Sequence, residues 1–434
     1  MQGGWVSPMT KILLSDESPV GRPLSNEELS WVGSVPSLAG VFGASVAAYI
    51  VDKYGRKIGV MSVAFLQGLC WLIKLLPSTP ETLILARVFC GLAGGGTFNV
   101  VPVYVKEVCQ DDIRGVAGLV IMMSQNIGIL AIFAMGAYLD YYTVLSIAVV
   151  VPILNIILMF FAPESPAYLV KIGKVEEAAA TIANLRGLDV SDKAIQNEMD
   201  LIKSEDDAFK SIKSVTILSV LRQPAWRRGI ILMTCIIFAH ASNGAFSIIT
   251  YASSVLKSSG VTMSPELLSL SIPVFMIFAS LVSMSLVERL GRKPIFVTTF
   301  ILSAISLACL ATILLLQQQG VVVPGWLPVV AIVVTVCCYA GGVSPMPFVV
   351  MSEMFNFQVR TKIICGMVTM AWFESFVQLS SFRAIASASG PHVAFYIFIL
   401  INIFGAVCIM VFLPETKGKT VEQIEKELVS RKIC

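Results

Sequence analysis

Carboxylates and arginines recur at matching distances in two widely separated parts of the chain. An acidic residue stands four positions before an arginine in two places, and seven positions before an arginine in two others: Asp52 with Arg56, Glu288 with Arg292, Glu107 with Arg114 and Glu353 with Arg360. Carboxylate and guanidinium groups form strong bidentate ion pairs, so ion pairing is the chemistry that these residues offer. The sequence contains no nucleophile–base pair, metal-ligand cluster or phosphate-binding loop, and we therefore expect no enzyme activity.

The pairs belong to a longer internal repeat. Val51-Asp52-Lys53-Tyr54-Gly55-Arg56-Lys57 returns as Val287-Glu288-Arg289-Leu290-Gly291-Arg292-Lys293, and Pro163-Glu164-Ser165 returns as Pro414-Glu415-Thr416. The landmarks keep the same order in both copies, and only the loop lengths differ. Two such copies, each a set of membrane spans, are typical of a transporter built by duplication.

The composition indicates an integral membrane protein. Of the 434 residues, 56% are hydrophobic and only 14% are charged, whereas a soluble domain carries about 25% charged residues. The net charge of +3 gives no reason to expect a nucleic-acid partner. Nearly all of the ten cysteines fall inside apolar runs and none has metal-ligand spacing, so we expect neither a disulfide framework nor a metal site.

Eleven apolar segments are long enough to cross a bilayer as helices, which takes about 20 residues. Five precede and six follow a hydrophilic interval. We therefore expect an all-α membrane protein made of two like-built helical bundles. The expected divisions are an extracellular N-terminal segment at 1–28, a first bundle at 29–163, a cytoplasmic linker with short helices at 164–228, a second bundle at 229–413 and a cytoplasmic tail at 414–434.

Basic residues mark one side of the membrane. Most of the 31 Lys and Arg residues fall in the linker, the tail and the turns at 52–57, 106–114, 288–293 and 353–362, while the loops on the other side hold only Lys11, Arg22 and Lys257. Cytoplasmic loops are enriched in Lys and Arg. We therefore expect the C-terminus in the cytoplasm and the N-terminus outside.

Taken together, the motifs resemble the sugar-porter branch of the major facilitator superfamily, most closely the facilitative glucose and trehalose transporters. Besides the two repeated turns, the resemblance is carried by Gly4-Trp5-Val6-Ser7-Pro8, Arg87 with Gly91, Pro102-Val103-Tyr104, Pro345-Met346-Pro347 and Pro414-Glu415-Thr416-Lys417-Gly418. That family has twelve spans in two pseudo-symmetric bundles, and eleven are found here. In the family the Gly-Trp-x-Ser-Pro element follows most of the first span, so the chain is expected to lack most of that span.

The resemblance implies a cytoplasmic gate made from the acid–arginine pairs. An acid at the C-terminal end of a helix is unfavourable, so Asp52 and Glu288 should have cationic or helix-N-terminal partners. The implied clusters, which would clamp the cytoplasmic side while the pathway is open outward, are Arg56, Glu107 and Arg114 in one half and Arg292, Glu353 and Arg360 in the other. The alternative is that these residues only provide the positive-inside signal, but that signal does not need the matched acids.

The resemblance also implies a substrate pathway, and here the chain departs from the family. The family binds sugar through Gln-Gln-x-x-Gly-x-Asn on the seventh span, because sugar hydroxyls need donors and acceptors. That stretch here reads His240-Ala241-Ser242-Asn243-Gly244-Ala245-Phe246. With the spans numbered as in the twelve-span family, the implied pathway residues are Gln125 or Asn126 on the fifth span, His240, Asn243 and Phe246 on the seventh, Phe348 on the tenth, and Trp372 and Ser375 on the eleventh. Each lost neutral hydrogen bond removes about 0.5–1.5 kcal/mol, which predicts weaker hexose binding.

His240 and Glu374 are titratable side chains near the middle of their spans. Ionisable groups there are functional candidates because their burial in lipid is costly, and histidine titrates near neutral pH. One interpretation is a proton-linked role for both residues. The other is that His240 is a neutral replacement for glutamine and Glu374 bonds a neighbouring helix.

We expect passive, alternating-access transport of a small polar solute, a hexose or a trehalose-like sugar, without a cofactor. Because the sugar-binding amides are replaced, a transport-deficient nutrient receptor or regulator and a carrier of a non-sugar organic solute stay open as alternatives. The expected partners are the solute and the lipid bilayer, and the resemblance favours the plasma membrane.

Overall fold

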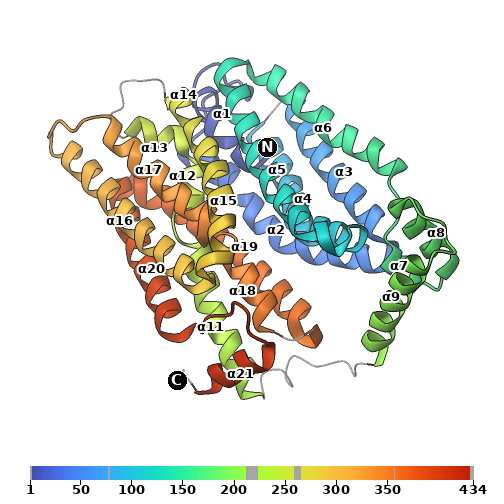
Figure 1. Cartoon of the computed structure of the whole chain (residues 1–434). Helices are drawn as coiled ribbons and strands as arrows, with labels where there is room; N and C mark the ends of the chain where they lie inside the picture. The colour runs from blue at the N-terminus through green and yellow to red at the C-terminus, as the bar shows by residue number, and fades with distance from the viewer. Residues whose placement is uncertain (1, 77–78, 212–222, 259–264, 356, 431–434) are drawn as a thin grey trace.

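Helices form every regular element in the part of the chain that the computed structural model describes, which is residues 2–76, 79–211, 223–258, 265–355 and 357–430. Two bundles lie side by side, the first in blue to cyan at the right of Figure 1 and the second in yellow-green to red at the left. Within the described residues ten helices are long and apolar enough to span a membrane, and Met123–Tyr138 is a shorter apolar stretch of an eleventh. The expected all-α membrane fold is confirmed.

The first bundle consists of α2 (Asn26–Tyr54), α3 (Arg56–Leu75), α4 (Pro80–Val108), α5 (Asp111–Tyr138) and α6 (Tyr141–Phe161), preceded by η1 (Gln2–Gly4) and the short α1 (Val6–Leu13). Capping side chains fix several of these starts. Ser25 and Glu28 form a capping box at α2, and Asp140 accepts a hydrogen bond from the N–H of Thr143 at α6. Such caps satisfy N–H groups that have no partner within the helix.

The second bundle contains four uninterrupted helices, α15 (Ser271–Leu290), α16 (Arg292–Gln318), α19 (Phe357–Ser389) and α20 (Pro391–Phe412), and the short α14 (Pro265–Ser269). Its other two spans are interrupted. One consists of α11 (Pro224–Ala241), α12 (Ala245–Thr250) and α13 (Ala252–Ser258), and the other of α17 (Trp326–Cys338), the π-helical turn η2 (Tyr339–Val343) and α18 (Met346–Met354). Continuous spans were expected at both places. The first is broken where Gly244 has a φ of 97°, and the second where Pro345 and Pro347 interrupt the helical hydrogen bonds.

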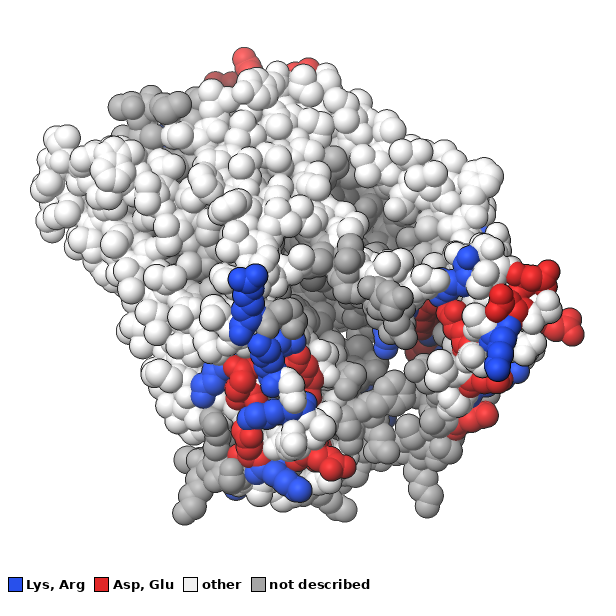
Figure 2. Space-filling view, in the orientation of Figure 1, with Lys and Arg blue, Asp and Glu red and all other residues white. Residues whose placement is uncertain are grey.

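Charged residues concentrate at one end of the bundles, named here the charged end, which carries the turns at 52–57 and 288–293. Lys, Arg, Asp and Glu gather in the lower part of Figure 2, while the surface above is largely uncharged. The helices α7 (Pro166–Lys171), α8 (Val175–Arg186) and α9 (Lys193–Ser211) pack there around Ile182, Ile195 and Met199, and α21 (Val421–Ser430) lies under the second bundle (Figure 1). An uncharged body with charges at one end suits a protein held in a bilayer.

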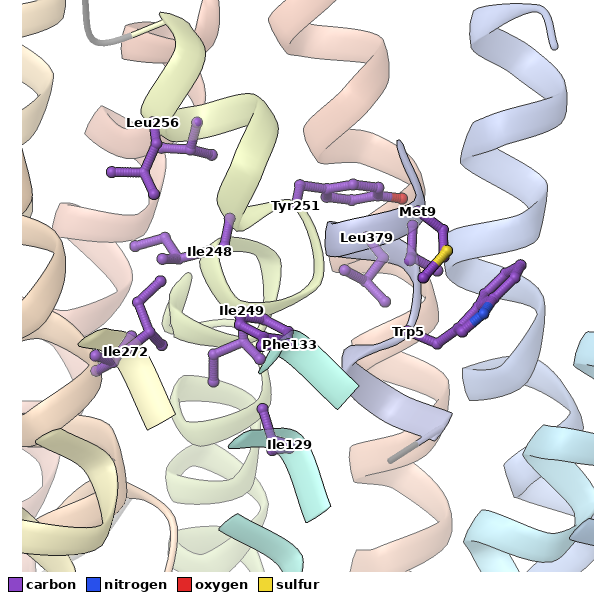
Figure 3. Close-up of a cluster of buried hydrophobic side chains, with 14 of the residues drawn as sticks. Trp5, Met9, Ile129, Phe133, Ile248, Ile249, Tyr251, Leu256, Ile272 and Leu379 are labelled. Carbon is purple, nitrogen blue, oxygen red and sulfur yellow. The ribbon is translucent and has the colours of Figure 1, made fainter. Parts of the chain in front are cut away.

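The two bundles contact each other through α1 with α13, α2 with α19 and α5 with α15, and they also meet at the end opposite the charged turns. One hydrophobic core there joins residues of both bundles, including Trp5 and Phe133 from the first and Ile248, Tyr251 and Leu379 from the second (Figure 3). The hydroxyls of Ser7 and Ser253 are 3.1 Å apart across this seam. The structure is therefore closed at the end away from the charged turns.

Candidate functional site

The turn between α2 and α3 is shaped around the carboxylate of Glu164. Gly55 has a φ of 104°, which residues with a side chain rarely adopt, and a Cβ at this position would collide with that carboxylate. The carboxylate accepts hydrogen bonds from the backbone N–H groups of Arg56 and Lys57 at 3.0 and 3.1 Å. Because the first N–H groups of a helix lack internal partners and carry partial positive charge, Glu164 stabilises the start of α3.

The Arg56 side chain forms the second part of this cluster. Its Nε and Nη2 atoms donate to the two carboxylate oxygens of Glu107 at 2.7 and 2.8 Å, and the two side chains are only 12% and 16% exposed. The hydroxyl of Ser165 also donates to Glu107, and the guanidinium lies 5.4 Å from the centre of the Tyr168 ring. This pair therefore ties α3, α4 and the start of the linker together.

The second bundle repeats the arrangement. Gly291 has a φ of 92°, and the Glu415 carboxylate beside it accepts hydrogen bonds from the backbone N–H groups of Arg292 and Lys293 at 3.0 and 3.1 Å. The Arg292 guanidinium pairs with Glu353 at 2.9 Å, and the Thr416 hydroxyl donates to the same carboxylate. Each half thus ends in the same set of contacts, as the repeated sequence predicts.

Some of the predicted gate residues lie in these clusters, and others do not. Asp52 pairs with Lys171 of the linker at 3.2 Å, so it has the cationic partner that its place at the end of α2 demands. The ion pairs of Arg56 and Arg292 each join residues of one half. The side chains of Arg114, Glu288 and Arg360 lie outside the described residues.

Sequence reasoning overlooked the residues that complete each cluster, namely Glu164, Ser165, Glu415 and Thr416. The repeated Pro-Glu-Ser and Pro-Glu-Thr triplets were a usable signal. They place an acid and a hydroxyl at equivalent positions in the two halves, which indicates a shared structural role. The triplets by themselves mark the duplication, and their sequence alone does not show which residues they contact.

Glu415 lies beyond the last span, and several backbone N–H groups donate hydrogen bonds to its carboxylate. Burial by itself raises the pKa of its carboxyl group. The backbone N–H groups of Lys417, Arg292, Lys293 and Thr416 donate to the ionised form and together bring the pKa below its ordinary value. The carboxylate is therefore the form that anchors the tail to α16.

The break between α11 and α12 places polar groups inside the second bundle. Asn243 is fully buried there; its Oδ1 atom accepts a hydrogen bond from the N–H of Ala245 at 3.0 Å, and its carbonyl accepts one from Asn402 at 2.9 Å. Within the described structure, Asn243 Nδ2 and Asn402 Oδ1 have no hydrogen-bond partner. An amide donor and an amide acceptor are thus left free at the break. Asn402 is a further residue that sequence reasoning missed.

His240 is the last residue but one of α11, just before this break. Its Nδ1 atom lies 2.9 Å from the carbonyl oxygen of Val343 in the π-helical turn. Its ring stacks on Tyr339, with 6.0 Å between ring centres, and contacts Phe348 edge-on at 6.2 Å. The structure therefore brings together two predicted pathway residues, His240 and Phe348, where both interrupted spans meet.

The other predicted pathway residues have separate surroundings. Asn126 is buried and its Nδ2 donates to Ser280 of the second bundle at 3.3 Å, whereas Gln125 is exposed. Of these two alternatives, only Asn126 contacts the seam. Phe246 packs against the core shared by both bundles. The hydroxyl of Ser375 donates to the carbonyl of Ala371 in its own helix at 2.8 Å.

Trp372 packs across the seam onto the first bundle. A Cβ at Gly40 would lie 2.7 Å from its indole ring and one at Gly94 would lie 3.4 Å from it, and Phe98 contacts the ring edge-on at 6.0 Å. Small residues allow this close approach between helices. Glu374, two positions further along α19, lies instead beside α11 and α20 in a groove of the second bundle.

Comparison with known proteins agrees with this architecture. A family model described as "Sugar (and other) transporter" matches residues 9–428. Facilitated trehalose transporters Tret1 from Anopheles gambiae and Bombyx mori are each 28% identical to this chain, over 97% and 94% of its length. The chain spans 53% of the Anopheles protein and 80% of the Bombyx protein.

Solved structures show the same fold. The inward open conformation of the xylose transporter XylE from E. coli superposes with a TM-score of 0.80 at 19% identity, covering 98% of this chain and 96% of that one. The proton:xylose symporter XylE bound to 6-bromo-6-deoxy-D-glucose gives a TM-score of 0.77 at 18% identity, covering 99% of this chain and 96% of that one. Among the described residues, ten helices are long and apolar enough to span a membrane, and the family model matches nearly the whole length. The chain therefore belongs to the sugar (and other) transporter family.

Proposed function

We propose that the chain moves a sugar or a similar polyhydroxylated solute across a membrane by alternating access. The observation that carries the proposal is the interrupted span at Ser242–Gly244, where Asn243 offers a free amide donor and Asn402 a free amide acceptor in the described structure. Interrupted helices near the middle of the membrane are where transporters of this type bind their solutes. A sugar hydroxyl requires both kinds of group.

The closed opposite end supports a pathway that is open towards the charged end. Both bundles contribute to the hydrophobic core there, and Ser7 and Ser253 join them. The high structural similarity to an inward open transporter agrees with this arrangement. The concentration of basic residues at the charged end supports placing that end, the linker and the C-terminus in the cytoplasm.

In this proposal the two charged clusters stabilise the two halves of the gate, one cluster in each bundle. Each holds the start of one helix, α3 or α16, against the carboxylate that opens the linker or the tail. The repeated geometry keeps each bundle rigid at the charged end, so that the bundles move against each other as units. Asp52, Arg114, Glu288 and Arg360 belong to the same proposed gate.

The aromatic residues of the proposed pathway reduce the range of candidate solutes. His240, Phe348 and Trp372 stand where the family carries amides or a tryptophan, and the Nδ1 atom of His240 is engaged with Val343. Aromatic faces bind the apolar C–H faces of sugar rings, and few amides remain for the hydroxyls. Trehalose, named in the curated relatives, presents two such rings and is the solute that we place first, with hexoses second and the plasma membrane as its location.

Counterflow in proteoliposomes tests the proposal. Purified protein is reconstituted with unlabelled trehalose or D-glucose inside, and uptake of the labelled sugar is followed against L-glucose as the control. Saturable uptake of trehalose that falls about tenfold in Asn243→Ala, the equivalent of roughly 1.4 kcal/mol of lost binding, is the expected result. Binding of sugar without counterflow would instead support the second candidate, a nutrient receptor. Neither binding nor counterflow with any sugar tested would contradict the proposal.

A further inference from the structure

A groove in the second bundle lies apart from the proposed sugar pathway. It has a volume of about 530 Å³ and is formed by α11, α19 and α20. Its lining is apolar except at Thr234, Cys235 and Glu374, and Phe238, Leu400 and Phe404 form most of its walls. This size is within the range of about 300–1,000 Å³ that small-molecule sites occupy.

The groove faces the lipid rather than the seam between the bundles. All of its walls belong to the second bundle, and α20 lies on the side of that bundle away from α2–α6 (Figure 1). On α19, Trp372 packs against the first bundle, and Glu374 is two residues further on, which turns its side chain about 200° around the helix. Phe238, Leu400 and Phe404 are 41%, 68% and 43% exposed, as lipid-facing residues of a membrane protein are.

Glu374, which lines the groove, carries a strong hydrogen-bonding atom that has no partner among the described residues. Glu374 Oε2 is buried and accepts no hydrogen bond from any described residue. The hydroxyl of Thr234 already contacts the Met367 sulfur at 3.9 Å, and a thiol such as Cys235 is a weak donor. Glu374 lies near the middle of α19, at a depth where a carboxyl group without a partner is costly.

We propose that this groove binds a lipophilic amine that enters from the bilayer, with its amine on Glu374 and its apolar body against Phe238, Leu400 and Phe404. The head groups of phospholipids lie about 15 Å from the middle of the hydrocarbon core, so they do not reach Glu374. A sugar would leave most of its hydroxyls without partners on these walls. An amine satisfies the carboxyl group by both charge and hydrogen bonding, and a long alkyl chain fills the remaining volume.

Protection of a native cysteine gives a direct test. Cys235 lines the groove, whereas Cys309 is exposed on α16 and serves as an internal reference. The protein in nanodiscs is alkylated with N-ethylmaleimide in the presence of dodecylamine, and modification of each cysteine is followed by mass spectrometry. At roughly ten times its dissociation constant, dodecylamine is expected to slow alkylation of Cys235 about tenfold and to leave Cys309 unchanged.

A Glu374 variant and dodecane, which has the alkyl chain but no amine, distinguish binding of the amine from occupation of the groove by hydrocarbon alone. Protection by dodecylamine is expected to disappear in Glu374→Gln, and dodecane is expected to protect neither protein. Equal protection by dodecane, equal protection of Glu374→Gln, or slowing of Cys309 to the same degree would each overturn the proposal. Thermal unfolding provides a second readout that is independent of alkylation. Dodecylamine should raise the unfolding temperature of the unmodified protein more than that of Glu374→Gln, and equal shifts would contradict the proposal.

Discussion

Arg56 donates two hydrogen bonds to the carboxylate of Glu107, at 2.7 and 2.8 Å, and so joins the start of α3 to the end of α4. Arg292 and Glu353 make the corresponding contact in the second bundle. Because Ser165 and Thr416 donate to the two carboxylates in corresponding ways, the same substitution in each half is a matched experiment on the two bundles.

Replacing Glu353 by Gln removes the charge from its contacts with Arg292 and Thr416. A charge-assisted hydrogen bond contributes about 1.5–3 kcal/mol, so we expect a loss of that order, reduced because the Glu353 side chain is 25% exposed. The measurement is thermal unfolding in nanodiscs, with Glu107→Gln as the partner variant. Glu422→Gln, at an exposed position of α21, is the control and should change little. A Glu353→Gln protein as stable as that control would contradict the structural role.

The same variant tests the gate. Each ion pair lies within one bundle, so in the proposal its loss makes that bundle less rigid at the charged end. Closure of the charged end should then be less stable, which reduces trapping by ligands that bind from the opposite side. Unchanged trapping in both Glu353→Gln and Glu107→Gln would rule out the clusters as part of the gate.

Alanine at Gly55 should be far more damaging than alanine at Gly173. Both glycines have a positive φ, 104° and 82°, but a Cβ has open space at Gly173 and collides with Glu164 at Gly55. A side chain in the left-handed region costs about 1–2 kcal/mol, and Gly55, with a ψ of 166°, lies in a region that only glycine populates readily. Gly55→Ala also displaces the carboxylate from the start of α3. Gly55→Ala should therefore lower the unfolding temperature more than Gly173→Ala does, and equal losses would contradict the prediction.

Acid should loosen the tail through Glu415. The pKa of this carboxyl is lowered in the folded protein by the N–H groups that surround it, so its stabilising effect is present above the ordinary pKa of glutamate. That effect is lost as the pH falls through the lowered value. Thermal stability followed from pH 7 downwards should therefore drop below about pH 4.5, and the drop should be smaller in Glu415→Gln. Identical profiles for the two proteins would assign the acid sensitivity to other groups.

A disulfide across the seam should stop transport. The hydroxyls of Ser7 and Ser253 are 3.1 Å apart in different bundles, so cysteines at both positions are placed to form a bond that holds the opposite end closed. Oxidation of the double variant should abolish sugar counterflow, and reduction should restore it. Each single variant, oxidised in the same way, controls for the native cysteines. Full activity of the cross-linked protein would contradict alternating access.

Asn126 and Gln125 form a natural pair of test and control. Asn126 is buried and donates to Ser280 across the seam, whereas its neighbour Gln125 is exposed. We expect Asn126→Ala to lower the rate of counterflow and Gln125→Ala to leave it unchanged. The reverse order would show that α5 is rotated differently about its axis in the transporting protein.

The fold could be predicted from the sequence because hydrophobic length and duplicated motifs are local properties. The apolar runs are long enough to span a bilayer, and Gly55 and Gly291 mark the same turn in each repeat. The partners in space could not be read in the same way. Glu164 and Arg56 are far apart in the sequence, and the pattern of residues did not show that the acid meets the start of α3.

The two interrupted spans show a second limit of the sequence. The runs at 229–256 and 325–351 are long and predominantly apolar, so hydropathy predicts continuous helices. The break after Ala241 depends on Gly244, where a Cβ would lie 2.5 Å from Phe398 of another helix, and on the buried Asn402. His240 and Glu374 both lie mid-span, and the sequence leaves two interpretations open for them, a proton-linked role or a structural one. The direction in which each side chain points depends on helix rotation, which composition does not give.

The carboxylates that hold α3 and α16 are the first charged residues of the linker and of the tail. A force on the linker or the tail would therefore reach the starts of α3 and α16 at the charged end. Under the proposed function, these two segments are mechanically connected to the two bundles that move.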